Sequence, residues 1–194
     1  MPKTSPFSLA GKTALIAGAS RGIGLAIAKE IAAAGAHTIL AARSLDKLKA
    51  EVRALKKEGH SAAAFELDVA SEESIAACVK KLGAKVDILV NVSGTNVRKR
   101  VEDYTKEEYD RIMQTNLHGI VTLTKGIGVE MKKRGKGGKV VMIGSLMSLL
   151  GLPYLAVYAM TKSALYGLTR VLAAEWAATI FRSIASRRAS SSRT

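Results

Sequence analysis

Short apolar runs and amphipathic stretches alternate along most of this chain. The apolar runs fall at 13–17, 37–42, 61–66, 86–91 and 139–144. The stretches between them have a helical pattern, and we expect helices from the glycine cluster near residue 22 to about 34 and at 45–58, 72–82, 105–133 and 154–176. Strands without polar alternation are typical of parallel sheets, in which helices bury both faces. The pattern predicts an α/β fold with a doubly wound parallel sheet and helices on both faces.

Residues able to bind a ligand follow the end of each predicted strand. Because ligands of parallel sheets bind beyond the carboxyl ends of the strands, we expect these residues to gather at one edge. In chain order they are Gly18, Gly22 and Gly24, then Arg43, then Asp68, then Asn91 to Gly94, and finally Ser145.

The first of these groups, GASRGIG, lies between a strand and a helix. Glycines permit a tight turn and a close approach of the backbone to a pyrophosphate, while the helix N-terminus offers free N–H groups. In a strand–turn–helix context this pattern predicts a dinucleotide site. Its predicted members are Gly18, Ser20, Arg21, Gly22, Ile23 and Gly24.

The residue after the second strand distinguishes NAD from NADP. An acidic residue there would bind the adenosine ribose, whereas an arginine suits a 2′-phosphate. Arg43 occupies this place and Arg21 lies in the glycine turn. We therefore expect NADP to be preferred and NAD to be accepted as well; the alternative is that both arginines are merely solvated.

Tyr158 and Lys162 stand four residues apart at the start of the last predicted helix. Such a pair shares one helix face. A cation beside a phenol favours the charged form of the phenol and lowers its pKa, so that it can exchange a proton near neutral pH. Tyrosine and lysine at this spacing are also common on surface helices. The functional interpretation of the pair therefore depends on the residues that follow the predicted strands.

Composition narrows the class of protein. The 194 residues are 48% hydrophobic, enough for one domain with a sizeable core. No apolar run reaches the length of a membrane span, and the N-terminus MPKTSPFSLAGK lacks a signal-peptide pattern, so we expect a cytoplasmic protein. Cys78 is the single cysteine and reads as a buried thiol, and the three histidines lack ligand spacing, so no metal is predicted.

The formal net charge of +14 raises nucleic-acid binding as an alternative. Most lysines and arginines are interleaved with acidic residues along helical stretches, which indicates a solvated face. We therefore expect a small-molecule substrate and neither nucleic acid nor membrane as a partner.

Together these residues resemble the short-chain dehydrogenase/reductase family over Gly11 to about Trp176, and the resemblance implies a Rossmann-type fold. It assigns Tyr158 as general acid or base, Ser145 to the substrate carbonyl oxygen, Lys162 to the nicotinamide ribose, and Asn116 to a water in the proton relay. The cofactor contacts that it adds lie after the third and fourth strands and in the last helix, at Asp68, Val69, Asn91, Ser93, Gly94, Tyr158 and Lys162. Val92 stands where the family usually has asparagine, which predicts some loss of stability or cofactor order.

The resemblance implies an NAD(P)-dependent oxidoreductase that transfers hydride between a nicotinamide and a carbonyl or secondary alcohol. The loop after the fourth strand is similar to that of gluconate 5-dehydrogenase-like members, so a sugar acid such as gluconate is the expected substrate. Asn96, Arg98 and Ser145 would contact it, and Arg98 could pair with a carboxylate or remain a solvated loop residue. The alternatives are a 3-oxoacyl-carrier-protein reductase and an inactive dinucleotide-binding remnant. Family members also suggest a homotetramer.

The resemblance ends after Trp176. We expect a nucleotide-binding domain at 1–176 and an atypical basic tail at 177–194, with the last strands of the family sheet missing and one sheet edge exposed. A frameshift would account for the tail: synonymous codons for 176–194, shifted by one inserted base, can encode a segment with the Val-Asn and Pro-Gly elements that the family has there. A C-terminus of unrelated origin is the alternative.

Overall fold

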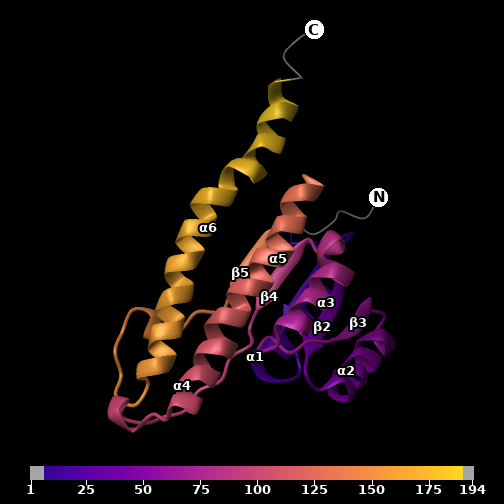
Figure 1. Ribbon diagram of the computed structural model, residues 1–194. Coiled ribbons are helices and arrows are strands. Elements are labelled where there is room, and N and C mark those ends of the chain that lie inside the picture. Colours follow the sequence, from indigo (N-terminus) through magenta and orange to yellow (C-terminus); the bar gives the residue numbers. More distant parts are fainter. Residues whose placement is uncertain (1–6, 190–194) are drawn as a thin grey trace.

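The computed structural model describes residues 7–189, with side chains described to residue 177. Five parallel strands form one sheet in the order β3-β2-β1-β4-β5 (Figure 1). From β1 the chain adds β2 and β3 on one side and then crosses to add β4 and β5 on the other, so the strand order reverses between β1 and β4. Sheets of this kind bind ligands at that point. The strands are β1 (Thr13–Ala17), β2 (His37–Ala42), β3 (Ala62–Glu66), β4 (Ile88–Asn91) and β5 (Lys139–Met142).

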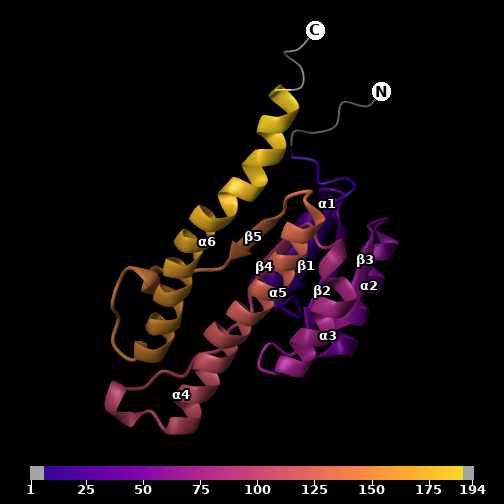
Figure 2. The ribbon, with the colours of Figure 1, turned by 45° about the horizontal axis from the view of Figure 1, so that its top comes forward.

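The helices lie on both faces of the sheet (Figure 2). The side chains of β1 identify the helices on each face. Ala14 and Ile16 contact the cluster built on α1 and α2, while Leu15 and Ala17 contact the cluster built on α3 and α5. The helices are α1 (Gly22–Ala33), α2 (Leu45–Lys57), α3 (Glu72–Leu82), α4 (Lys106–Met113), α5 (Gly119–Arg134) and α6 (Ala156–Ala189).

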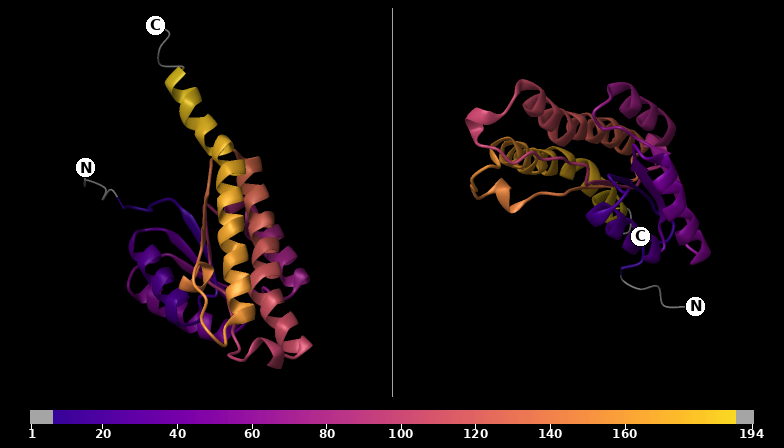
Figure 3. Two further views of the ribbon diagram at one scale, coloured as in Figure 1. Left: turned by 90° about the vertical axis from the view of Figure 1, so that its left-hand side faces the viewer. Right: turned by 90° about the horizontal axis from the view of Figure 1, so that it is seen from below.

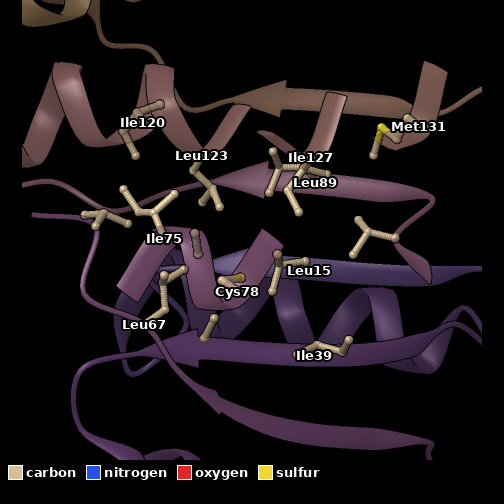
Figure 4. Packing of buried hydrophobic residues seen from close by; sticks show 14 of the residues in the cluster. Leu15, Ile39, Leu67, Ile75, Cys78, Leu89, Ile120, Leu123, Ile127 and Met131 are labelled. Carbon is tan, nitrogen blue, oxygen red and sulfur yellow. The ribbon is translucent and has the colours of Figure 1, made fainter. Parts of the chain in front are cut away.

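The larger core lies between the sheet and α3, α5 and the first part of α6. Figure 4 shows Ile127 of α5 beside Leu89 of β4, and Ile120 of α5 on the side of Ile75 of α3. Cys78 is fully buried in this cluster, as predicted, and burial raises the pKa of its thiol to about 12. The parallel sheet with helices on both faces confirms the predicted fold class.

The helix predicted over 105–133 is divided. A π turn at Gln114–His118 separates α4 from α5, and the Gly119 N–H donates to the carbonyl of Gln114, five residues earlier. Three short 3₁₀ turns also occur, at Gly83–Lys85, Val101–Asp103 and Leu146–Ser148. Single π turns are frequent at functional sites, and this one contains Asn116.

The last helix also differs from the prediction at both ends. It begins at Ala156 because Tyr154 has a φ of 67°, which no helical residue adopts. It continues past Trp176 to Ala189, since neither glycine nor proline interrupts residues 168–189. Figure 3 shows α6 running beside α5. The predicted boundary between residues 176 and 177 therefore falls inside a continuous helix, and the side chains of the predicted tail after Ala177 lie outside the described residues.

In the described part of the chain, β5 pairs with β4 alone, so its outer edge is free. Val141 on β5 is 45% exposed. Beside the strand lies an apolar groove of about 450 Å³ between α5, β5 and α6, with Met131, Val140, Leu172 and Trp176 among its lining residues. Within the same residues, no helix is long and apolar enough to cross a membrane.

Candidate active site

The glycine turn after β1 is built so closely that side chains do not fit. Gly18 has a φ of 99°, and a Cβ there would lie 2.6 Å from the Ser93 nitrogen. A Cβ on Gly24 would lie 2.2 Å from the carbonyl oxygen of Gly18. These two glycines let the loop after β4 and the start of α1 close onto the turn. Gly22, with a φ of 57°, faces open space instead.

The N-terminus of α1 fits an anionic group. Arg21 is the N-cap residue, and its extended backbone brings no side-chain cap, while the first turn contains no acidic residue. The main-chain N–H groups of this turn are therefore free to bind phosphate oxygens. Ser20 is half-buried beside the turn, and Ile23 is 64% exposed. The residues present thus fit the pyrophosphate of a dinucleotide.

Arg43 and Arg21 are both exposed at this edge of the sheet. Among the described residues, no carboxylate lies within ion-pair distance of either guanidinium. Their charges are available to a ligand, as a 2′-phosphate requires.

The segment after β3 is fixed by local hydrogen bonds. One carboxylate oxygen of Asp68 accepts from the Ala70 N–H at 2.9 Å, and the Asp68 N–H donates to the Ser74 hydroxyl at 3.0 Å. Val69 is buried, and its carbonyl oxygen would lie 1.7 Å from a Cβ on Gly119. The predicted cofactor segment after β3 is therefore packed directly on the first turn of α5.

The segment Asn91 to Gly94, at the end of β4, is hydrogen-bonded to the end of β1. The N–H groups of Val92 and Ser93 both donate to the carbonyl of Ala17 at 2.9 Å. Val92 packs against the core cluster built on α1 and α2. An apolar side chain therefore fills the position at which the family usually has asparagine. The ideal Cβ position of Gly94 lies 3.6 Å from Oδ1 of Asn116, which places this glycine beside the π turn.

Asn91 is placed in the core rather than at the sheet edge. It is 3% exposed, its Nδ2 donates to the Thr124 hydroxyl at 2.9 Å, and its Oδ1 has no hydrogen-bond partner within the described structure. Its side chain joins β4 to α5, and its contact with the cofactor stays a prediction.

Asn116 clamps the loop after β4. It is fully buried in the π turn, its Oδ1 accepts from the Thr95 N–H at 2.7 Å, and its Nδ2 donates to the Thr95 carbonyl at 2.8 Å. The same Nδ2 lies 3.5 Å from the Thr161 hydroxyl, which donates to the Tyr158 carbonyl. Asn116 thus links the loop to the helix that bears the tyrosine, and its role with a relay water stays a prediction.

Lys162 and Tyr158 share one face of α6, as predicted. Lys162 is 4% exposed, its Nζ donates to the carbonyl of Ile143 at 2.7 Å, and the same nitrogen lies 5.7 Å from the centre of the Tyr158 ring. Burial lowers the pKa of Lys162. The phenol of Tyr158 is half-buried and makes no side-chain hydrogen bond within the described residues, so its hydroxyl can meet a substrate.

Ser145 follows β5 and opens the 3₁₀ turn Leu146–Ser148. Its hydroxyl oxygen accepts from the Met147 N–H at 3.1 Å, which leaves its hydrogen free to be donated elsewhere. The structure therefore brings Ser145, Tyr158 and Lys162 to the carboxyl end of the sheet, where the glycine turn also lies.

The predicted substrate loop is held against the segment before α6. The Lys99 N–H donates to the Tyr154 carbonyl at 3.2 Å, and Lys99 Nζ forms an ion pair with Glu108 at 2.8 Å. Asn96 and Arg98 are exposed and alternate with the half-buried Val97 and Lys99. Their side chains are thus free for a ligand, and no contact yet assigns them one.

Several residues that support the site were missed from the sequence. Thr95, Thr124, Thr161 and Ser148 contribute hydroxyl or main-chain partners, and Gly119 allows the close contact with Val69. Thr161 and Ser148 lie within three residues of Lys162 and Ser145 in sequence, and that proximity is the one signal that could have identified them.

This chain is similar to several known proteins. The family model described as short chain dehydrogenase matches residues 12–185. Gluconate 5-dehydrogenase of Gluconobacter oxydans is 34% identical over 173 residues, which is 88% of this chain and 67% of that protein. The 2-dehydro-3-deoxy-D-gluconate 5-dehydrogenase of Bacillus subtilis is 38% identical, over 89% of this chain and 68% of that protein.

Two solved structures are similar to this chain in both sequence and fold. A gluconate 5-dehydrogenase from Burkholderia cenocepacia, in complex with NADP and tartrate, superposes with a TM-score of 0.84 at 34% identity, covering 89% of this chain and 69% of that one. A putative NAD(P)-dependent gluconate 5-dehydrogenase from Beutenbergia cavernae with bound NADP gives 0.86 at 38% identity, covering 90% and 70%. This chain spans about two thirds of the length of these relatives.

The matches confirm the predicted fold class and the predicted class of enzyme, an NAD(P)-dependent oxidoreductase. They extend over the glycine turn, the Asn116 turn and the Tyr158–Lys162 pair alike. On these grounds the chain belongs to the short-chain dehydrogenase family.

Proposed function

We propose that this chain binds NADP and transfers hydride between it and a secondary alcohol or carbonyl carbon of a sugar acid such as gluconate. The proposal depends on one observation. The uncapped N-terminus of α1 lies at the same edge of the sheet as Ser145, Tyr158 and Lys162. The gluconate-oxidising relatives support the substrate class.

The nicotinamide, when bound, supplies the hydride acceptor or donor. In the oxidation, the Tyr158 oxygen takes the proton of the substrate hydroxyl while the carbon that bears this hydroxyl loses hydride. In the reduction, Tyr158 gives the proton back to the substrate oxygen. The free hydrogen of the Ser145 hydroxyl is donated to the substrate oxygen. The Lys162 ammonium, beside the ring, stabilises negative charge that develops on the phenol oxygen.

Arg43 determines the cofactor preference in this proposal. Arg43→Glu should raise the Kd for NADP about 10- to 100-fold and leave the Kd for NAD near the parent value, because one charge-assisted contact with the 2′-phosphate, about 1.5–3 kcal/mol, is lost. Titration calorimetry with each cofactor measures this. Arg53→Ala, on the exposed face of α2, is the matched control and should leave both constants unchanged. A parent chain that binds NAD tenfold more tightly than NADP would contradict the assignment.

Substrate class is tested by turnover of gluconate with NADP, followed at the absorbance band of the reduced nicotinamide. We expect turnover with gluconate, and a KM about fivefold higher for Arg98→Ala, because a surface-exposed arginine–carboxylate contact is worth about 1 kcal/mol. Arg100→Ala is the control, since Arg100 lies two residues away and has Glu102 as an ion-pair partner. NADP binding without turnover of any sugar acid would instead favour an inactive dinucleotide-binding chain.

The remaining parts of the proposal concern the whole protein. A homotetramer, a cytoplasmic location and a separate tail at 177–194 stay predictions. Light scattering of the purified chain decides the first of these.

A further inference from the structure

The Ser148 hydroxyl lies between two residues of the catalytic set. It accepts a hydrogen bond from the main-chain N–H of Ser145 at 3.3 Å and donates one to the main-chain carbonyl of Lys162 at 3.1 Å. One side chain thus joins the backbone of the serine turn to the backbone of α6.

Ser148 also takes part in a cap with Ser145. Ser145 and Ser148 form a reciprocal cap, in which the Ser145 oxygen accepts from the Met147 N–H while the Ser148 oxygen accepts from the Ser145 N–H. The first bond occupies an acceptor position of the Ser145 oxygen, so its hydrogen points toward other acceptors. The second bond fixes the peptide that carries Ser145.

The same segment is tied to α6 at two further places. Lys162 Nζ donates to the carbonyl of Ile143, two residues before Ser145. The Ser163 hydroxyl lies 3.4 Å and 3.3 Å from the carbonyls of Met147 and Ser148. Among these links, the Ser148 hydroxyl is the one that contacts the peptide of Ser145 itself.

We propose that Ser148 is a positioning residue, which sets the distance between the Ser145 hydroxyl and the Tyr158–Lys162 face by bridging the peptides of Ser145 and Lys162. The inference rests on the proposed function, because it assigns Ser148 a part in hydride transfer through Ser145.

A double-mutant cycle on kcat tests the proposal. We expect Ser148→Ala to lower kcat about three- to tenfold, which corresponds to one lost hydrogen bond, and Ser145→Ala to lower it about 10²- to 10³-fold. Because Ser148 acts through Ser145, the double variant should be no slower than Ser145→Ala alone. The Kd for NADP should stay constant throughout. Ser61→Ala, which removes a serine hydrogen bond to His37 at the opposite end of the strands, is the matched control.

Two outcomes would overturn the inference: effects that multiply in the double variant, or a Ser148→Ala variant with the parent kcat. Amide hydrogen exchange gives an independent reading. Exchange at the Ser145 N–H should become about tenfold faster in Ser148→Ala and stay constant in Ser61→Ala, since only the former removes its acceptor. If the parent chain shows no turnover, the proposed function fails, and unchanged exchange at Ser145 then refutes the bridge by itself.

Discussion

Replacing Tyr158 with phenylalanine is expected to lower kcat by a factor of about 10² to 10⁴, the usual contribution of a general acid or base. The change removes one oxygen atom from a ring that is otherwise held by its position on α6, four residues before Lys162. The Kd for NADP and the free energy of unfolding should change little, because the lost hydroxyl has no hydrogen-bond partner within the described structure.

Tyr166 offers a matched control on the same helix. It is 48% exposed and stacks with Arg170 on the outer side of α6. Tyr166→Phe should leave kcat at the parent value, so a loss in both variants would point to a disturbed helix instead of lost proton transfer. A Tyr158→Phe enzyme with parent-like kcat would remove Tyr158 from its proposed role.

Gly119→Ala is expected to have the largest effect on stability, a loss of about 3 kcal/mol or more in the free energy of unfolding. The added Cβ would lie 1.7 Å from the Val69 carbonyl oxygen, which is backbone and can yield only if α5 moves away from the loop after β3. Overpacking of side chains alone costs about 1–3 kcal/mol. Denaturant unfolding followed by circular dichroism measures the change.

Gly167→Ala supplies the control with the opposite sign. Gly167 lies in α6 with open space around its Cβ position, so alanine should gain up to about 1 kcal/mol from helix propensity. If Gly119→Ala unfolded at the same denaturant concentration as the parent, α5 would not be packed on Val69 as described.

The strands and the principal site residues could be predicted from the sequence because their signals are local. Residues 14–17 and 39–42 are unbroken apolar runs, and the predicted strands at 13–17 and 37–42 have these bounds in the structure. The parallel order then brings their carboxyl ends together, so Gly18 and Arg43 had to lie at one edge. The helical period alone was enough to predict that Tyr158 and Lys162 share one face of a helix.

The parts that escaped prediction depend on contacts between distant segments. The π turn forms where Asn116 meets Thr95 and where Gly119 meets Val69, and no periodicity within 105–133 encodes those partners. Asn91 looked like an edge residue from its place at the end of β4, but its partner Thr124 lies on α5 and draws the side chain into the core. Ser148 gains its role from the carbonyl of Lys162, fourteen residues later.

The π turn also affects how this protein can be aligned with others. Its hydrogen bond spans five residues where an α-helical turn spans four, so the helix contains one inserted residue between α4 and α5. Each residue of an α-helix turns the chain by about 100°, and a relative without the insertion would present a different face of α4 if paired without a gap. A single gap at Gln114–His118 restores both phases, and a gene that lost one codon there would keep a continuous helix while rotating Asn116 away from Thr95.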